Sequence, residues 1–341
     1  MEINIIGLDL AKNVFHTHGA DASGAVLFSK QLRRNKVLEF FARQSPCTIA
    51  MEACGGAHYW AREIGKQGHT VRLIPPKYVK PFVKRQKNDA ADAQAICEAA
   101  QRPTMRFVAV KSEEQQANAA VFRARDLLVR QRTQLINALR GQLAEYGWIV
   151  AQGPSHVASL IEVVKDPASD LPQAAREVFA ILAEAVQSLD ERIKRLDVEI
   201  GRRAKVDEVV RRLMTIPGIG PITATALAAL APDPATFQKG RDFAAWVGLT
   251  PLQHSTGGKQ KIGRTSKMGE RTLRRLLIIG ASAVVKQASA GRGAPKGSWL
   301  ARMIARKPRM LVVVSLANKM ARIVWALMAK GEVYKAPAGT V

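Results

Sequence analysis

The sequence predicts an α/β domain with a mixed β-sheet, followed by regions that are mainly helical. Two observations predict the sheet: antiparallel-strand signals come first, and apolar strands then alternate with helical segments. A third observation predicts the helices, because heptad spacing and Ala-rich runs dominate after about residue 112. We therefore expect three domains, at residues 1–112, 113–204 and 205–341.

The predicted sheet is built from short apolar segments separated by turn residues. Helices are expected at about 35–43 and around 59–64. His16 and His18 alternate along the second strand, and we interpret both as ordinary strand residues. The expected strands, in chain order, are 3–10, 13–18, 25–30, 47–51 and 71–74.

A basic segment follows the last of these strands. It contains Lys84, Arg85 and Lys87, which we expect to contact nucleic acid. The residues after it are Ala-rich and favour a helix. Asp89 and Asp92 are three residues apart in this helix, so they share one of its faces.

The predicted second domain is a helical hairpin or coiled coil. Residues 113–146 form a long helix candidate with apolar positions about seven residues apart, and a loop with segments at 153–154 and 167–172 follows. Apolar residues then step by four and three over 182–200. We interpret this region as an oligomerisation arm; the alternative is a helix packed inside its own domain.

The third domain opens with a Gly-rich turn between two helical segments at 216–221, resembling a helix-hairpin-helix. Backbone N–H groups at Gly218 and Gly220 could bind a phosphate at the start of the second helix. The turn could also be a plain connector. From Leu273 onward the chain is predicted to be helical and basic.

The charge balance points to a polyanionic partner. Lys and Arg together number 52 against 28 Asp and Glu, a net charge of +24, and nucleic acid is the simplest polyanion. The apolar stretch at 310–317 is too short to span a bilayer, and no signal peptide is evident, so we expect no membrane attachment and a cytoplasmic location. The cysteines Cys47, Cys54 and Cys97 lack metal-ligand spacing.

Four acidic residues lie at the ends of predicted elements in the first domain. Carboxylates in a chain that binds polyanions suggest Mg²⁺, which takes carboxylate, phosphate and water oxygens. Two such ions could clamp a phosphodiester. Asp9 alone could equally cap a turn. The four candidate ligands are Asp9, Glu52, Asp89 and Asp92.

A second constellation lies at 248–269. Ser255 and Thr256 precede Gly-Gly-Lys on an expected flexible loop, where a hydroxyl could act as a nucleophile or help to hold a phosphate. The order of residues is not that of a P-loop. The residues alone favour a phosphate-binding loop without a covalent role. The basic residues expected to contact nucleic acid here are Lys259, Lys261, Arg264, Lys267 and Arg271.

Several of these segments resemble one known family. The segments 7–12, 51–56 and 87–93 are similar to the motifs of DEDD transposases of bacterial insertion sequences, in the family numbered one hundred and ten. Its members are described as RNA-guided bridge recombinases. The segments 217–220, 248–259 and 271–274 match as well, and the form of 253–259 resembles the seekRNA-type subgroup.

The resemblance implies an RNA-guided recombinase that excises and inserts its own element. The first domain would have a RuvC-like (RNase H-type) fold in which the four acids hold Mg²⁺. The last would be a transposase domain in which Ser255 forms a phosphoserine link to DNA, although a one-residue shift would assign that role to Thr256. Implied partners are a structured noncoding guide RNA, donor and target DNA, and further copies of the chain as a dimer or tetramer.

Two other functions fit the residues less well. One is a Mg²⁺-dependent nuclease for Holliday-type junctions, which cuts through water attack without a covalent intermediate. The other is an RNA- or DNA-binding scaffold in which the acids are structural. The serine loop distinguishes the recombinase from the nuclease, and the acidic quartet distinguishes both from the scaffold.

Overall fold

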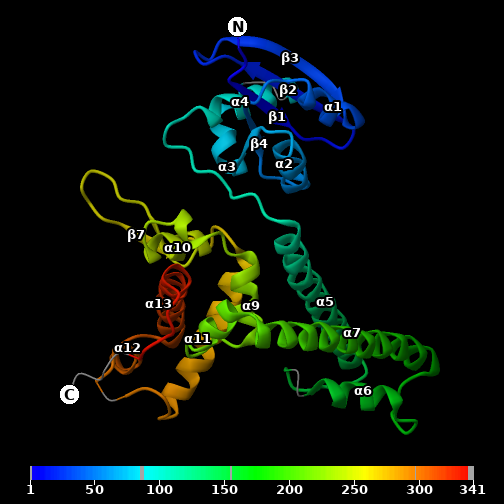
Figure 1. Cartoon of the computed structure of the whole chain (residues 1–341). Helices are drawn as coiled ribbons and strands as arrows, with labels where there is room; N and C mark the ends of the chain where they lie inside the picture. Colours follow the sequence, from blue (N-terminus) through cyan, green and yellow to red (C-terminus); the bar gives the residue numbers. More distant parts are fainter. Residues whose placement is uncertain (1, 85–87, 154–155, 296, 337–341) are drawn as a thin grey trace. The chain divides into compact units, whose positions relative to one another are not determined.

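The computed structural model describes residues 2–84, 88–153, 156–295 and 297–336. The chain divides into two compact units, Met1–Gln116 and Ala117–Val341 (Figure 1). The first unit holds the β-sheet, and the second is almost entirely helical.

The first unit is built on a five-stranded sheet in the order β3-β2-β1-β4-β5. The β1/β2 and β2/β3 pairs are antiparallel, whereas β1/β4 and β4/β5 are parallel. This mixed sheet was predicted, and its topology is consistent with an RNase H-like domain. The strands are β1 (Ile5–Asp9), β2 (Val14–Ala20), β3 (Val26–Arg33), β4 (Thr48–Glu52) and β5 (Thr70–Ile74).

Helices cover both faces of the sheet. Alternate residues of a strand point to opposite faces, and β1 follows this rule. Leu8 packs with Phe41 and Trp60 under α1 and α2, whereas Ile5 packs with Ile96 of α4. The helices are α1 (Val37–Ala42), α2 (Ala57–Gly65), α3 (Pro76–Val79) and α4 (Asp89–Ala100).

Gly7 lets α4 approach the sheet closely. A Cβ atom at Gly7 would lie 2.7 Å from the backbone nitrogen of Cys97 and would also collide with the carbonyl oxygen of Ala93. Both are backbone atoms of α4, so a side chain at Gly7 could not be accommodated by a rotamer change. The glycine therefore sets the distance between β1 and α4.

The second unit contains helices α5 to α13 and one hairpin, β6–β7. α5 begins at the end of the first unit and continues into the second. The helices are α5 (Glu113–Ala144), α6 (Val157–Lys165), α7 (Gln173–Val206), α8 (Glu208–Met214), α9 (Pro221–Leu230), α10 (Gly240–Val247), α11 (Arg271–Ser289), α12 (Trp299–Arg306) and α13 (Arg309–Lys330); the strands are β6 (Pro251–Gln253) and β7 (Ile262–Thr265).

The long helices α5 and α7 run antiparallel to one another. Arg125 pairs with Asp197, and Arg132, one heptad further along α5, pairs with Asp190, one heptad earlier on α7. The predicted long helices are present. The loop expected at 167–172 is present, and a helix that was not predicted, α6, lies between the two expected loop segments and buries Leu160 against the α5–α7 pair.

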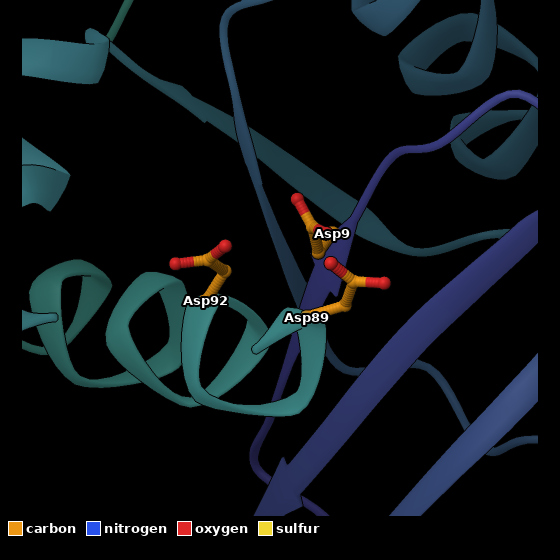
Figure 2. A group of neighbouring side chains, drawn as sticks. All are labelled: Asp9, Asp89 and Asp92. Carbon is orange, nitrogen blue, oxygen red and sulfur yellow. The ribbon is translucent and has the colours of Figure 1, made fainter. Parts of the chain in front are cut away.

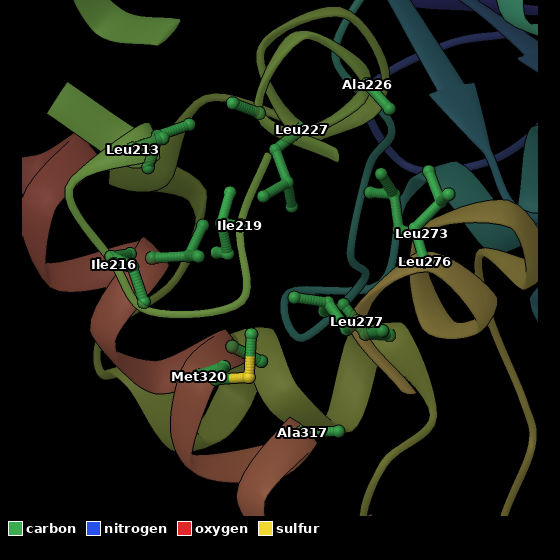
Figure 3. Packing of buried hydrophobic residues seen from close by; sticks show 14 of the residues in the cluster. Leu213, Ile216, Ile219, Ala226, Leu227, Leu273, Leu276, Leu277, Ala317 and Met320 are labelled. Carbon is green, nitrogen blue, oxygen red and sulfur yellow. The ribbon is translucent and has the colours of Figure 1, made fainter. Parts of the chain in front are cut away.

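The largest core of the second unit surrounds α9. Because α9 is apolar on all sides, it has no face suited to water and is packed centrally. Figure 3 shows Leu227 of α9 facing Ile219, Leu277 of α11 and Met320 of α13. The turn predicted at 216–221 therefore lies against this core.

α13 is longer than the apolar stretch expected at 310–317. At 22 residues it is, by length and composition, able to cross a membrane, so the sequence-based length argument was wrong. Its buried side chains nevertheless belong to the protein core. Val313, Ala317 and Val324 pack in the same cluster as Leu277 of α11.

Candidate active site

Asp9 is the last residue of β1 and lies on the α4 face of the sheet. Gly7, two residues earlier, faces Ala93 and Cys97 of α4. Because side chains alternate along a strand, Asp9 is directed to the same face. Its side chain is only partly exposed.

The first turn of α4 brings two more carboxylates to Asp9. Asn88 caps this helix, with its side-chain oxygen accepting a hydrogen bond from the Ala91 backbone nitrogen at 2.7 Å. Asp89 and Asp92 occupy one face of that capped turn. Figure 2 shows both beside Asp9, and one carboxylate oxygen from each of the three lies within 4.8 Å of the others.

The three carboxylates have the donor set of a divalent metal site. The pKa of Asp9 is raised from 3.8 to about 6, primarily by burial. The negative charges of Asp92, Asp89 and Glu52 raise it further. A bound cation would offset both the burial and the mutual repulsion, so these oxygen ligands fit a hard divalent ion.

Glu52 lies near this group but outside it. It ends β4, which pairs in parallel with β1, so its side chain is at the same end of the sheet as Asp9. Burial and the charge of Asp92 raise its pKa. The structure therefore brings Asp9, Asp89 and Asp92 together within ligand distance, with Glu52 as a neighbouring carboxylate.

His16 belongs to the site, although the sequence-based interpretation treated it as an ordinary strand residue. It is the direct cross-strand partner of Asp9, so the two side chains share a face. Its Nε2 lies 3.5 Å from Oδ2 of Asp89. The pairing register of the predicted meander was the signal that could have found it.

Of the predicted basic segment, Lys84 is exposed and lowers the pKa of His18, second to burial. Arg85 and Lys87 lie outside the described residues.

Ser255 lies in the β6–β7 hairpin of the second unit, where a flexible loop was expected. The hairpin tip is a two-glycine turn, with positive φ at Gly257 and Gly258 and two backbone hydrogen bonds between Thr256 and Lys259. Ser255 is exposed just before this turn, and its Oγ accepts a hydrogen bond from the Lys261 backbone nitrogen at 3.3 Å.

The base of the hairpin is anchored to the helical core. Arg274 of α11 donates hydrogen bonds to the carbonyl oxygens of Val247 and Met268, on either side of the hairpin. Asn318 of α13 donates to the carbonyl oxygen of Leu249 at 3.2 Å. The exposed tip therefore projects from a fixed base.

The predicted cations of this region are all exposed, on the hairpin, in the loop after it and at the start of α11. Within the part of the chain that the structure describes, no carboxylate lies within 4.0 Å of any of them. They are therefore available to an external anion. These residues are Lys259, Lys261, Arg264, Lys267 and Arg271.

The Gly-rich turn before α9 has a packing role in addition to the predicted phosphate contact. Gly218 has a φ of 85°, and a Cβ there would lie 2.7 Å from the carbonyl oxygen of Gly280 in α11. Gly220 is open, and it caps α9 without a side-chain hydrogen bond. The phosphate contact stays a prediction.

Two family models match this chain, one over the carboxylate cluster and one over the hairpin. Residues 6–147, which include the carboxylate cluster, match a model for IS110-type DEDD transposases. Residues 210–294, which include the hairpin, match the model described as "Transposase IS116/IS110/IS902 family". The chain belongs to the IS110-family DEDD transposases. This family implies a divalent metal at the acidic cluster, and the protein is a DNA transposase.

Full-length relatives agree with this assignment. The chain is 49% identical to a "Probable family 20 transposase" of Pseudomonas aeruginosa over 98% of this chain and 99% of the relative. It is 40% identical to the transposase for insertion sequence element IS1328 of Yersinia enterocolitica, over 97% and 98%. It is 39% identical to the transposase for IS1111A of Coxiella burnetii, over 99% and 93%.

Proposed function

We propose that this IS110-family transposase is an RNA-guided, site-specific recombinase that joins DNA through a phosphoserine intermediate. The observation that carries the proposal is the convergence of Asp9, Asp89 and Asp92 within 4.8 Å, in a chain that also presents an exposed serine among free cations. We place its action in the cytoplasm, with no membrane partner.

The metal in this proposal is Mg²⁺, held by Asp9, Asp89 and Asp92 with Glu52 nearby. Carboxylates together with phosphate oxygens and water are the ligands that Mg²⁺ takes in enzymes acting on phosphate esters. When bound, it supplies charge neutralisation at the scissile phosphate. The capped first turn of α4 supports the assignment, because it holds two ligands in fixed positions.

Ser255 is the proposed nucleophile. Its Oγ forms a bond to the DNA phosphorus, the bond from phosphorus to the leaving DNA oxygen breaks, and the serine proton is released as the DNA oxygen gains one. Lys259 and Lys261 would bind the phosphate oxygens beside it. Thr256 remains the alternative because it is also exposed, but it lies within the tight turn.

Guide RNA and self-association complete the proposal. A net charge of +24 suits a protein that holds both RNA and DNA by their backbones. Val178 and Ile181 of α7 are 54% and 65% exposed. Exposed apolar side chains on this long helix support the proposal that it contacts a further copy of the chain.

The proposal is tested by trapping the covalent intermediate. The protein is mixed with its guide RNA, Mg²⁺ and labelled DNA, and SDS-resistant protein–DNA adducts are measured. We expect an adduct with the unaltered chain and with Thr256→Ala, and none with Ser255→Ala. Asp9→Asn should abolish the adduct while DNA binding persists.

The competing nuclease gives a different result. If DNA is cleaved without any adduct, and equally by Ser255→Ala, the protein is a Mg²⁺-dependent junction nuclease and the recombinase proposal is wrong. Adduct formation that needs no RNA would refute RNA guidance alone.

A further inference from the structure

A pocket on the first unit has a composition suited to nucleotide binding, and neither the metal site nor the hairpin accounts for it. The pocket has a volume of about 730 Å³, within the range of small-molecule sites. Among the described residues that line it, none is acidic. Its lining includes Asn13, Val14, Arg33, Arg34, Tyr59 and Trp60.

The aromatic side of the pocket comes from α2. Tyr59 is 44% exposed, and its ring packs edge-on against the buried ring of Trp60, with centroids 5.3 Å apart. The contact fixes Tyr59 while leaving much of the ring accessible. No hydrogen bond of the Tyr59 hydroxyl is found within the described residues. An exposed, supported aromatic ring is a stacking surface for a nucleobase.

The cationic side comes from the end of β3. Arg34 lies over the rings of Trp60 and Phe15, at 5.2 Å and 5.7 Å from their centroids. It uses one donor, to the carbonyl oxygen of Lys12 at 3.4 Å, which leaves other N–H groups available. Arg33, the last residue of β3, pairs with Val14 and is directed to the other face of the sheet, so it lines the pocket only at its edge. The guanidinium group of Arg34, beside a stacking ring, matches a phosphate attached to a base.

The pocket lies on the opposite face of the sheet from the carboxylates but at the same end of β1. Phe15 and Trp60 belong to the core under α1 and α2, whereas Asp9 faces α4. The chain from Asp9 to Asn13 is four residue steps, so their Cα atoms are at most about 15 Å apart. A strand held in the pocket can therefore pass over this loop to the metal site.

We propose that this pocket binds one unpaired nucleotide of a DNA single strand, with the base on Tyr59 and the phosphate at Arg34. RNA has the same bases and phosphates, so an RNA strand is the competing occupant of the pocket. We assign DNA because the chain is a DNA transposase and because the Cα atoms of Asp9, in the carboxylate cluster, and Asn13, which lines the pocket, are at most about 15 Å apart. The inference does not depend on Ser255 or on a covalent intermediate.

The first test is photocrosslinking of the full-length chain, in EDTA so that no cleavage occurs. The probe is an oligo(dT) single strand carrying 5-bromodeoxyuridine, and crosslinked peptides are mapped by mass spectrometry. We expect crosslinks within the peptide that contains Tyr59 and Trp60. Crosslinks confined to other peptides would overturn the proposal.

The second test is affinity by fluorescence anisotropy with the same strand. Tyr59→Ala should weaken binding about 5-fold or more, because stacking on an aromatic ring contributes at least that much, while Tyr59→Phe should bind normally. Arg106→Gln, at an exposed residue elsewhere in the same unit, measures how much the loss of one charge away from the pocket weakens binding. Equal losses in Tyr59→Ala and Arg106→Gln would refute the base contact.

Two altered strands complete the affinity test. A strand of abasic deoxyribose phosphates should bind the unaltered chain and Tyr59→Ala equally, because it has no base to stack. If Tyr59→Ala weakens oligo(U) more than oligo(dT), the DNA assignment is wrong. Circular dichroism confirms that each variant is folded.

Discussion

The imidazole Nε2 of His16 lies 3.5 Å from Oδ2 of Asp89, joining the second strand of the sheet to the first turn of α4. His16 is directly opposite Asp9 in the β1/β2 pair, so it is a neighbour of two candidate ligands. An imidazole beside a ligating carboxylate can fix the orientation of that carboxylate.

Replacing His16 should therefore weaken metal binding. In His16→Ala, Asp89 loses its partner from β2, and we expect the affinity for Mn²⁺ or Mg²⁺ to fall roughly 10-fold. Isothermal titration calorimetry measures this directly. His156→Ala, an exposed histidine in the other unit, is the control. Unchanged affinity in His16→Ala would show that the contact has no role in the site.

The raised pKa of Asp9 makes the stability of the metal-free protein depend on pH. The folded state binds the proton more tightly than the unfolded chain, so the Asp9 contribution is fully present below about pH 4 and is lost as pH rises towards 6. Above that pH, Asp9→Asn should be more stable than the unaltered protein by roughly 1–2 kcal/mol in EDTA.

Thermal unfolding between pH 4 and 7.5 tests this expectation. The difference in stability between Asp9→Asn and the unaltered protein, which we call the gap, should grow as the pH rises from about 4 to 6. Excess Mg²⁺ should stabilise the unaltered protein and reduce the gap. Asp170→Asn, which removes an exposed carboxylate of the other unit, should show no such gap. A constant gap at all pH values would contradict the burial argument.

A methyl group at Gly7 should push α4 away from the sheet. The Cβ of Gly7→Ala would meet backbone atoms at Ala93 and Cys97, and overpacking of this kind costs about 1–3 kcal/mol in the free energy of unfolding. Stabilisation by Mg²⁺ should also decrease, because Asp89 and Asp92 move with the helix. Gly65→Ala, where a Cβ would meet no atom outside its own helix and chain neighbours within 4 Å, should cause no such loss of stability and no decrease in the stabilisation by Mg²⁺.

The hairpin base should be needed for strand transfer more than for DNA affinity. Arg274→Leu leaves the carbonyl oxygens of Val247 and Met268 without their donor, which costs about 1–3 kcal/mol where they are buried. We expect faster tryptic cleavage at Lys259 and Lys261 and loss of strand transfer, with DNA affinity within about 2-fold of normal. If strand transfer survives while the cleavage rate rises, a fixed base is unnecessary.

The hairpin cations should contribute to the salt dependence of DNA binding. Each phosphate contact adds about 0.9 to the slope of log affinity against log salt concentration for duplex DNA. Lys259→Gln, Lys261→Gln and Arg264→Gln together should lower that slope by up to about 2.7. Arg202→Gln removes a charge already paired with Glu199 and should change the slope little.

The spacing of residues along the chain was enough to predict the strands, the helix α4 and the carboxylates that lie at their ends. Strand alternation and apolar runs gave the five-stranded sheet, and the three-residue spacing of Asp89 and Asp92 placed both on one face of α4. Asp9 could be predicted because a carboxylate ending an apolar strand is costly without a partner.

The remaining features depend on contacts between distant segments. His16 enters the site only through the register of two strands, which the turn between them does not specify by composition. The β6–β7 hairpin has strands of three and four residues, too short for a periodic signal. The packing role of Gly218 requires Gly280, sixty-two residues later in the chain.

The close approach of Gly218 to Gly280 has a consequence for how DNA is held. α11 supports the Gly-rich turn at Gly280 and anchors the hairpin at Arg274, and these positions are separated by about 9 Å along the helix axis. One rigid helix therefore keeps two candidate phosphate contacts at a fixed spacing. Such a spacer lets the protein set its register on the nucleic-acid backbone without reading any base.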